Sequence, residues 1–173
     1  MDGRNICIVR RFDGNAAIQT DRRILESVCE GLLKNAIENT PDEGVVEIIT
    51  QDRGDEIRII FADHGVGITP ENQALIFSGF FHTQPTMRYA SKRPYEFNAG
   101  GAGADLLRIK SFASRLGFRV EFTSRRCQFL PTDEDGCPGR ISACSFVQAG
   151  NQCLFSSGSS FAVIFPSASK RSA

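Results

Sequence analysis

The stretch Asp63-His64-Gly65-Val66-Gly67-Ile68 is the strongest indication of how this chain folds. It follows an alternating strand pattern in which Ile57, Ile59 and Phe61 share one face, and it precedes a helix start. A carboxylate at a strand end offers an acceptor. Two glycines two apart let the backbone approach a flat ligand closely, because glycine lacks a side chain and tolerates positive φ. The same string also occurs in ordinary turns, so its meaning depends on the motifs that flank it.

The bulk composition is that of an ordinary globular protein. The chain has 173 residues, of which 41% are hydrophobic and 23% charged, enough for one domain with its own core. Twenty basic residues balance 20 acidic ones, so we expect no nucleic-acid partner. Since no apolar run is long enough to span a bilayer and no signal-peptide pattern is present, we expect no direct membrane insertion and a cytoplasmic location.

Hydrophobic periodicity predicts an α+β fold, a two-layer sandwich with helices on one face of a mixed, mostly antiparallel sheet. Strands are expected over residues 6–9, 45–50, 56–62, 119–123 and 160–165, with a long helix from Thr20 or Asp21 to Thr40. Two further helices are expected over 69–77, where Thr69 would be the N-cap, and over 104–116. We expect one domain over 1–166, with a lid at about 78–99, a Cys-rich insert at about 125–158 and a flexible tail at 167–173.

Two further motifs flank the opening stretch. Asn35 borders the apolar face of the long helix, where its amide either bonds neighbouring backbone or offers an oxygen to a hard cation such as Mg²⁺. The glycines of Gly100-Gly101-Ala102-Gly103 directly precede a helix. Such a loop is either a hinge with a close helix contact or an anion site made by backbone N–H groups.

The order of these motifs resembles the ATP-binding domain of the GHKL superfamily, and most closely the catalytic domain of sensor histidine kinases. The resemblance covers residues 6–166 apart from the Cys-rich insert, and it implies a Bergerat-type fold. The matching motifs are the N box Leu32-Leu33-Lys34-Asn35-Ala36, the G1 box at residues 63–68, the F box at 77–81, the G2 box Gly101-Ala102-Gly103 and the final motif Gly158-Ser159-Ser160-Phe161.

This resemblance implies a role for each matching residue. Asn35 would bind the Mg²⁺ that bridges the ATP phosphates, and Asp63 would accept a hydrogen bond from the adenine amino group. The glycines would lie against the nucleotide: Gly65 and Gly67 at the base, and Gly101 and Gly103 at the phosphates. Lys92 and Arg93 in the lid are candidate phosphate contacts or, equally, a solvated pair of charges. His64 is expected to line the pocket.

The sequence departs from the family at the phosphate end. The family usually places Asn, Glu or His four residues before the Mg²⁺-binding Asn, where this chain has Gly31. Glu30 lies about 140° around the helix from Asn35, whereas Glu38 lies only about 60° away, so Glu38 is the better candidate for a catalytic base and Glu30 the weaker one. Asp105 replaces the last G2 glycine, and its charge near phosphates is unfavourable unless a cation offsets it.

Four of the six cysteines fall within the insert, with the spacing Cys127-x9-Cys137-x6-Cys144-x8-Cys153. Four thiolates can form a closed tetrahedral site for Zn²⁺ or, less favourably, hold an iron–sulfur cluster. Reduced thiols or a redox-labile disulfide are the alternatives. Cys7 and Cys29 are expected to be packing residues.

The resemblance implies transfer of the γ-phosphoryl group of Mg·ATP to a His on a separate dimerisation domain. The partners would then be that phosphoacceptor domain and a downstream response regulator. One alternative is a standalone GHKL serine kinase of the anti-sigma-factor type. The other is a non-catalytic nucleotide-sensing or redox-sensing module, in which Gly31 and Asp105 mark lost chemistry.

Overall fold

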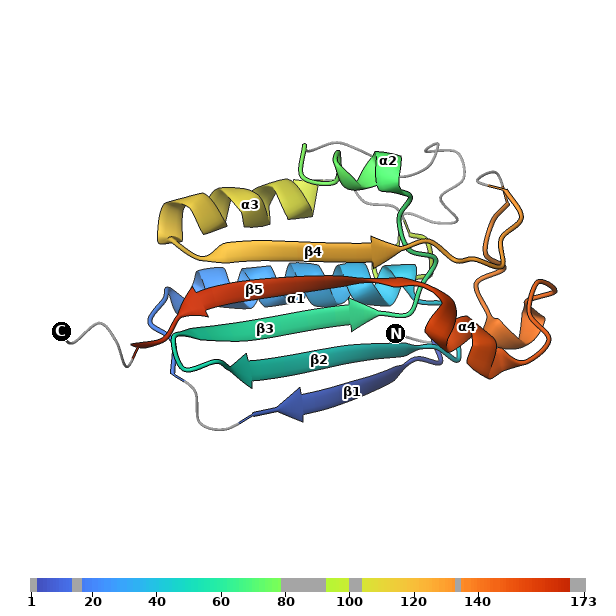
Figure 1. Cartoon of the computed structure of the whole chain (residues 1–173), viewed down its shortest axis with the longest axis horizontal. Helices are drawn as coiled ribbons and strands as arrows, with labels where there is room; N and C mark the ends of the chain where they lie inside the picture. The colour runs from blue at the N-terminus through green and yellow to red at the C-terminus, as the bar shows by residue number, and fades with distance from the viewer. Residues whose placement is uncertain (1–2, 14–16, 79–92, 100–103, 133–134, 169–173) are drawn as a thin grey trace.

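The computed structural model describes residues 3–13, 17–78, 93–99, 104–132 and 135–168 (Figure 1). Its centre is a five-stranded sheet in the order β1-β2-β3-β5-β4. β1 pairs with β2 in parallel, and the remaining pairs are antiparallel. The strands are β1 (Cys7–Phe12), β2 (Val45–Asp52), β3 (Glu56–Asp63), β4 (Arg119–Arg125) and β5 (Gly158–Pro166). The predicted α+β sandwich with a mixed, mostly antiparallel sheet is confirmed.

Two long helices, α1 (Arg22–Asn39) and α3 (Ala104–Leu116), lie together on one face of the sheet (Figure 1). α1 begins where the sequence predicted, because the Asp21 carboxylate accepts hydrogen bonds from the backbone N–H groups of Arg23 and Ile24. α3 ends at Gly117, whose φ of +71° and bond to the Ala113 carbonyl form a typical helix stop.

The core lies between these helices and the sheet. α1 supplies Val28 and Leu32, both at most 1% exposed, and α3 supplies Ile109. Phenylalanines of the sheet, with Phe118 just before β4, pack as pairs at centroid distances of 4.9 Å (Phe118 and Phe165) and 4.7 Å (Phe122 and Phe161). Burial of these large side chains is the main source of stability for the layer that supports the ends of β3 and β5.

The predicted helix over 69–77 is shorter than expected. α2 covers only Pro70–Gln73, and the chain continues in i+3 turns, with Leu75 N–H bonded to Asn72 and Ser78 N–H bonded to Leu75. These turns bring Phe77 edge-on to Phe122 and Phe161 in the core. Thr69 occupies the N-cap position, but its hydroxyl makes no capping bond.

The insert between β4 and β5 contains two short elements that the sequence did not predict. They are a 3-10 turn, η2 (Ile141–Ala143), and a helix, α4 (Gly150–Ser156). α4 lacks a conventional N-cap, since Ala149 stands there; instead the Gln152 side chain accepts from the backbone N–H groups of Gln148 and Ala149. Tertiary contacts and this side-chain bond, not apolar periodicity, define the helix.

Candidate functional site

Asp63 is the last residue of β3 and is only 5% exposed. Its Oδ1 atom accepts two backbone hydrogen bonds, from Gly65 at 3.0 Å and from Ser159 at 3.2 Å. Because both bonds go to Oδ1, the second carboxylate oxygen is the one that can accept from a ligand. Burial raises the pKa of this carboxyl from 3.8 to about 7, although the two N–H donors and His64 act in the opposite direction.

The two glycines of the G1 loop, residues 63–68, are required by close backbone contacts. A Cβ on Gly65 would overlap the carbonyl oxygen of Asn39 at the end of α1. A Cβ on Gly67, which has φ of +70°, would overlap the carbonyl oxygen of Arg125 at the end of β4. The loop is therefore wedged between the ends of α1 and β4.

Hydroxyl and amide side chains of β4, of α2 and of the residue before β5 form hydrogen bonds with the backbone of the same loop. The Ser124 hydroxyl accepts from the Ile68 N–H at 2.8 Å and donates to the Gly158 carbonyl at 3.0 Å. Ser157 donates to the Gly65 carbonyl, and Gln73 donates to the Ile68 carbonyl. The sequence did not identify these residues. The backbone partners of Ser124 and Ser157 lie 34 to 92 residues away in the chain, and the serines before β5 were the sequence feature that could have indicated them.

Asn35 lies on α1, partly exposed, and its Oδ1 accepts from Asn39 Nδ2 at 3.2 Å. Asn39 Nδ2 also donates to the Asn35 carbonyl at 2.8 Å. The Asn35 amide is thus engaged locally, through its bond with the Asn39 side chain. An amide oxygen has two lone pairs, so one bond from Asn39 leaves a position for a cation. The role of Asn35 as a Mg²⁺ ligand stays a prediction.

The two candidate bases occupy different surroundings. The side chain of Glu38 is largely buried and accepts from the Tyr95 N–H at 2.9 Å, while the Glu38 carbonyl accepts from the Asn98 N–H at 2.7 Å. Burial raises the pKa of Glu38. Glu38 therefore holds the end of the predicted lid, at Tyr95 and Asn98, against α1, whereas Glu30 is exposed to solvent. A catalytic role for either residue stays a prediction.

The two departures from the family lie next to each other where α1 meets α3. A Cβ on Gly31 would lie 3.6 Å from Ile109 and 4.0 Å from the Cβ of Asp105. The Asp105 carboxylate pairs with Lys34 at 3.5 Å and with Arg108 at 3.0 Å. These two cations offset the negative charge of Asp105.

Part of the predicted phosphate site lies outside the described residues. This applies to Gly101, Gly103 and Lys92, and to residues 79–92 of the predicted lid. Arg93 is described; it is exposed and lies 3.7 Å from Glu96. The phosphate contacts assigned to these positions stay predictions.

A hollow of about 450 Å³ lies at the ends of β3 and β4 and the start of β5, and is lined in part by Ala62, Thr123 and Ser160. These residues alternate with Phe61, Phe122 and Phe161, which face the helices. Asp63 follows Phe61 by two residues, so its side chain belongs to the helix-covered face. The hollow therefore lies mainly on the face opposite the helices, although its lining also includes Asp63 and Ser159.

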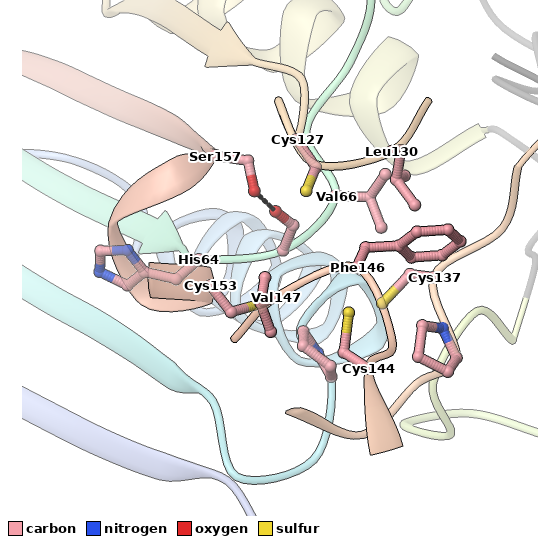
Figure 2. Close-up of a pocket in the computed structure, with 13 residues that line it drawn as sticks. His64, Val66, Cys127, Leu130, Cys137, Cys144, Phe146, Val147, Cys153 and Ser157 are labelled. Carbon is pink, nitrogen blue, oxygen red and sulfur yellow. Dashed lines mark hydrogen bonds between the residues drawn. The ribbon is translucent and has the colours of Figure 1, made fainter. Parts of the chain in front are cut away.

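The four cysteines of the insert line one small cavity behind the G1 loop, together with Val66, Leu130 and Phe146 (Figure 2). All are free thiols, and burial, followed by the charge of the other three, raises the pKa of Cys153 to about 11. Among the described residues, no group of three or more His, Cys, Asp or Glu side chains is placed to hold a metal ion as it stands. The predicted Zn²⁺ site is thus a clustering of thiols, not a formed coordination site.

The comparison with known families agrees with this geometry. Residues 20–166 match the family described as "Histidine kinase-, DNA gyrase B-, and HSP90-like ATPase". The chain belongs to this family. The predicted resemblance is confirmed, and the chain is an ATPase domain of the histidine kinase type.

Curated relatives include the sensor-like histidine kinase SenX3 of Mycobacterium tuberculosis, 31% identical over 113 residues, which are 65% of this chain and 26% of SenX3. The histidine protein kinase DivJ of Caulobacter vibrioides is 30% identical over 119 residues, covering 65% of this chain and 17% of DivJ. The chain thus spans about a quarter or less of the length of these relatives.

Solved structures share the fold. The mycobacterial sensor histidine kinase MprB aligns with a TM-score of 0.60 at 18% identity, over 94% of this chain and 82% of MprB. A histidine kinase ThkA in complex with the response regulator TrrA aligns with a TM-score of 0.57 at 17% identity, over 96% of this chain and 35% of ThkA. Within the part of this chain that the structure describes, no helix is both long enough and apolar enough to cross a bilayer.

The buried Asp63 carboxyl predicts a pH-dependent stability of the nucleotide-free protein. Its folded-state pKa of about 7 exceeds its ordinary value of 3.8, so the unfolded chain loses this proton at lower pH and the free energy of unfolding falls as the pH rises from about 4 to 7. An Asp63→Asn variant lacks this titration. Between pH 5 and pH 8 the wild type should lose about 3 kcal/mol relative to the variant. Urea denaturation at both pH values measures the difference, and parallel profiles would contradict it.

Proposed function

We propose that this chain is the catalytic domain of a sensor histidine kinase, which binds Mg·ATP and transfers the γ-phosphoryl group to a His on a separate dimerisation domain. The observation that carries the proposal is the buried Asp63, whose Oδ1 is fixed by Gly65 and Ser159 while its other oxygen can accept from a base. A carboxylate held in this way can accept a charge-assisted hydrogen bond from the exocyclic amino group of a base and so recognise it.

The positions of the residues indicate which part of Mg·ATP each would bind. Asp63 and the G1 loop would hold the adenine, and Asn35 would ligate the Mg²⁺ that accompanies the phosphates. Lys34 pairs with Glu38 and Asp105 and can move toward a phosphate, since its side chain is 26% exposed. Phosphoryl transfer needs mainly positioning and neutralisation of charge, so the domain can act without a strong base.

We also propose the partners of such a module. They are the phosphoacceptor domain of the same kinase and a downstream response regulator, as in the ThkA–TrrA complex. A domain that uses ATP in this way would work in the cytoplasm. A zinc ion at the cysteine cavity is a separate proposal, because it rests on different residues.

Incubation of the full-length protein with γ-labelled ATP tests the reaction. The expected product carries phosphate that is labile in acid and stable in alkali, as a phosphorylated His is. Acid-stable label on serine would instead support the serine kinase alternative. Binding of ATP without any label would support the non-catalytic module.

Replacement of Asn35 tests the Mg²⁺ site. An Asn35→Asp variant adds a negative charge next to the cation, so we expect the Mg²⁺ concentration for half-maximal ATP binding to change by about tenfold or more, while Mg²⁺-free binding changes little. Calorimetric titration of ATP with and without Mg²⁺ measures both quantities. Glu26→Gln is a matched control on the same helix, since Glu26 is exposed and pairs with Arg22 alone among the described ion pairs. An unchanged Mg²⁺ requirement in Asn35→Asp would remove Asn35 from the site.

A further inference from the structure

The cavity lined by Cys127, Cys137, Cys144 and Cys153 has a volume of about 20 Å³ (Figure 2). This is room for about one water-sized species, and it is too small for an organic ligand or a multinuclear cluster. Its other walls are mainly apolar. We propose that the four cysteine sulfurs bind a single Zn²⁺ ion, which fastens the insert to the back of the G1 loop.

The donor set fits this ion. Four sulfur ligands from one chain are typical of closed structural Zn²⁺ sites and are soft enough to exclude Mg²⁺ and Ca²⁺. Two outer groups can support the thiolates: the Gly139 N–H donates to Cys137, and the Ser156 hydroxyl lies 3.8 Å from the Cys127 sulfur. His64 also lines the cavity, but its Nε2 atom lies 3.4 Å from Glu47.

Coordination requires a small contraction of the cluster. Zinc–sulfur bonds are about 2.3 Å long, and in the described part of the chain the thiols have not reached an arrangement that holds an ion. Side-chain rotation of cysteines that already line one cavity can supply this movement. Binding energy from the ion would drive it, as in other sites that form on metal binding.

The insert has few other sources of stability. Its described regular structure is limited to η2 and α4, and the buried hydrophobic residues in it are Leu130, Ile141 and Cys153. The four sulfurs come from separate places: directly after β4, in the following loop, at the end of η2 and within α4. One ion would therefore cross-link segments that packing alone holds weakly.

The insert also contacts the G1 loop and the turn after α1. The Cys127 N–H donates to the Val66 carbonyl of the G1 loop at 2.7 Å. On the other side, the Asp42 N–H donates to the Gly139 carbonyl at 2.9 Å, and Ser142 donates to Glu43 in the turn after α1. An ion that orders the insert thus also supports the G1 loop at Val66 and the turn after α1, and its effect on adenine binding through the G1 loop rests on the proposed function.

Metal analysis of the whole chain tests the site. Protein expressed with added zinc and purified under reducing conditions should contain about one Zn²⁺ per chain, and Cys144→Ser should contain less than about half as much. Cys7→Ser and Cys29→Ser are matched controls and should keep the ion, because these residues lie on β1 and α1 outside the cavity. Less than about half an equivalent in the wild type, a disulfide among the four cysteines, or labile sulfide would overturn the proposal.

A second measurement does not depend on the folding of a variant. Wild-type protein stripped of metal should take up one Co²⁺ and show the visible bands and sulfur-to-cobalt charge transfer of a tetrahedral thiolate site, and one Zn²⁺ should abolish them. Absence of these bands would overturn the site. Both measurements stand whether or not the chain binds ATP. Removal of the ion should then weaken ATP binding at least tenfold, and an unchanged affinity would overturn the coupling to the G1 loop.

Discussion

An Asp63→Asn variant should lose ATP affinity by more than about 100-fold at pH 8, where the wild-type carboxyl is ionised. The amide oxygen of asparagine can still accept from Gly65 and Ser159, so the loop keeps its two anchoring bonds. The amide nitrogen takes the place of the second carboxylate oxygen and presents a donor to the adenine amino group, which is itself a donor. Calorimetric titration with Mg·ATP measures the loss.

Two controls separate recognition from folding. Glu47→Gln changes a nearby carboxylate that pairs with Arg11 and His64, and it should leave ATP affinity within about twofold. Inosine triphosphate carries an acceptor where ATP has its amino group, so the preference for ATP over inosine triphosphate should reverse in Asp63→Asn. If the variant bound ATP within about threefold of the wild type, Asp63 would not be the residue that reads the base.

The parts of the molecule that sequence reasoning predicted are those with local causes. The apolar face of α1 follows from helical spacing: Val28, Leu32 and Ala36 recur every four residues, and all three are buried. The end of β3 follows from the alternation of Ile57, Ile59 and Phe61, and α3 ends just before Gly117, which has a positive φ. In each case the pattern and the structure lie within a few residues of each other.

The parts that were missed depend on contacts between distant residues. The surroundings of Glu38 were not predicted, because its carboxylate accepts from the N–H of Tyr95, 57 residues away. Helix α2 ends early because Phe77 is drawn into the core against Phe122 and Phe161. No periodicity in a single sequence encodes such pairings, so the surroundings of a side chain are harder to predict than the element that carries it.

The second large effect is expected for Gly67→Ala, which should destabilise the protein by more than about 3 kcal/mol and abolish ATP binding. The added Cβ would meet the backbone of Arg125, which cannot turn aside as a side chain can, so the G1 loop must separate from β4 and from Cys127.

Gly54→Ala is the matched control. Gly54 has φ of +79°, close to the +70° of Gly67, but nothing lies within 4 Å of its added Cβ. Gly54→Ala should therefore lower the free energy of unfolding only by the cost of placing alanine in the left-handed conformation, about 1 kcal/mol. Urea denaturation of both variants measures the difference, and equal losses would mean that backbone conformation alone, not the contact with β4, requires glycine at this position.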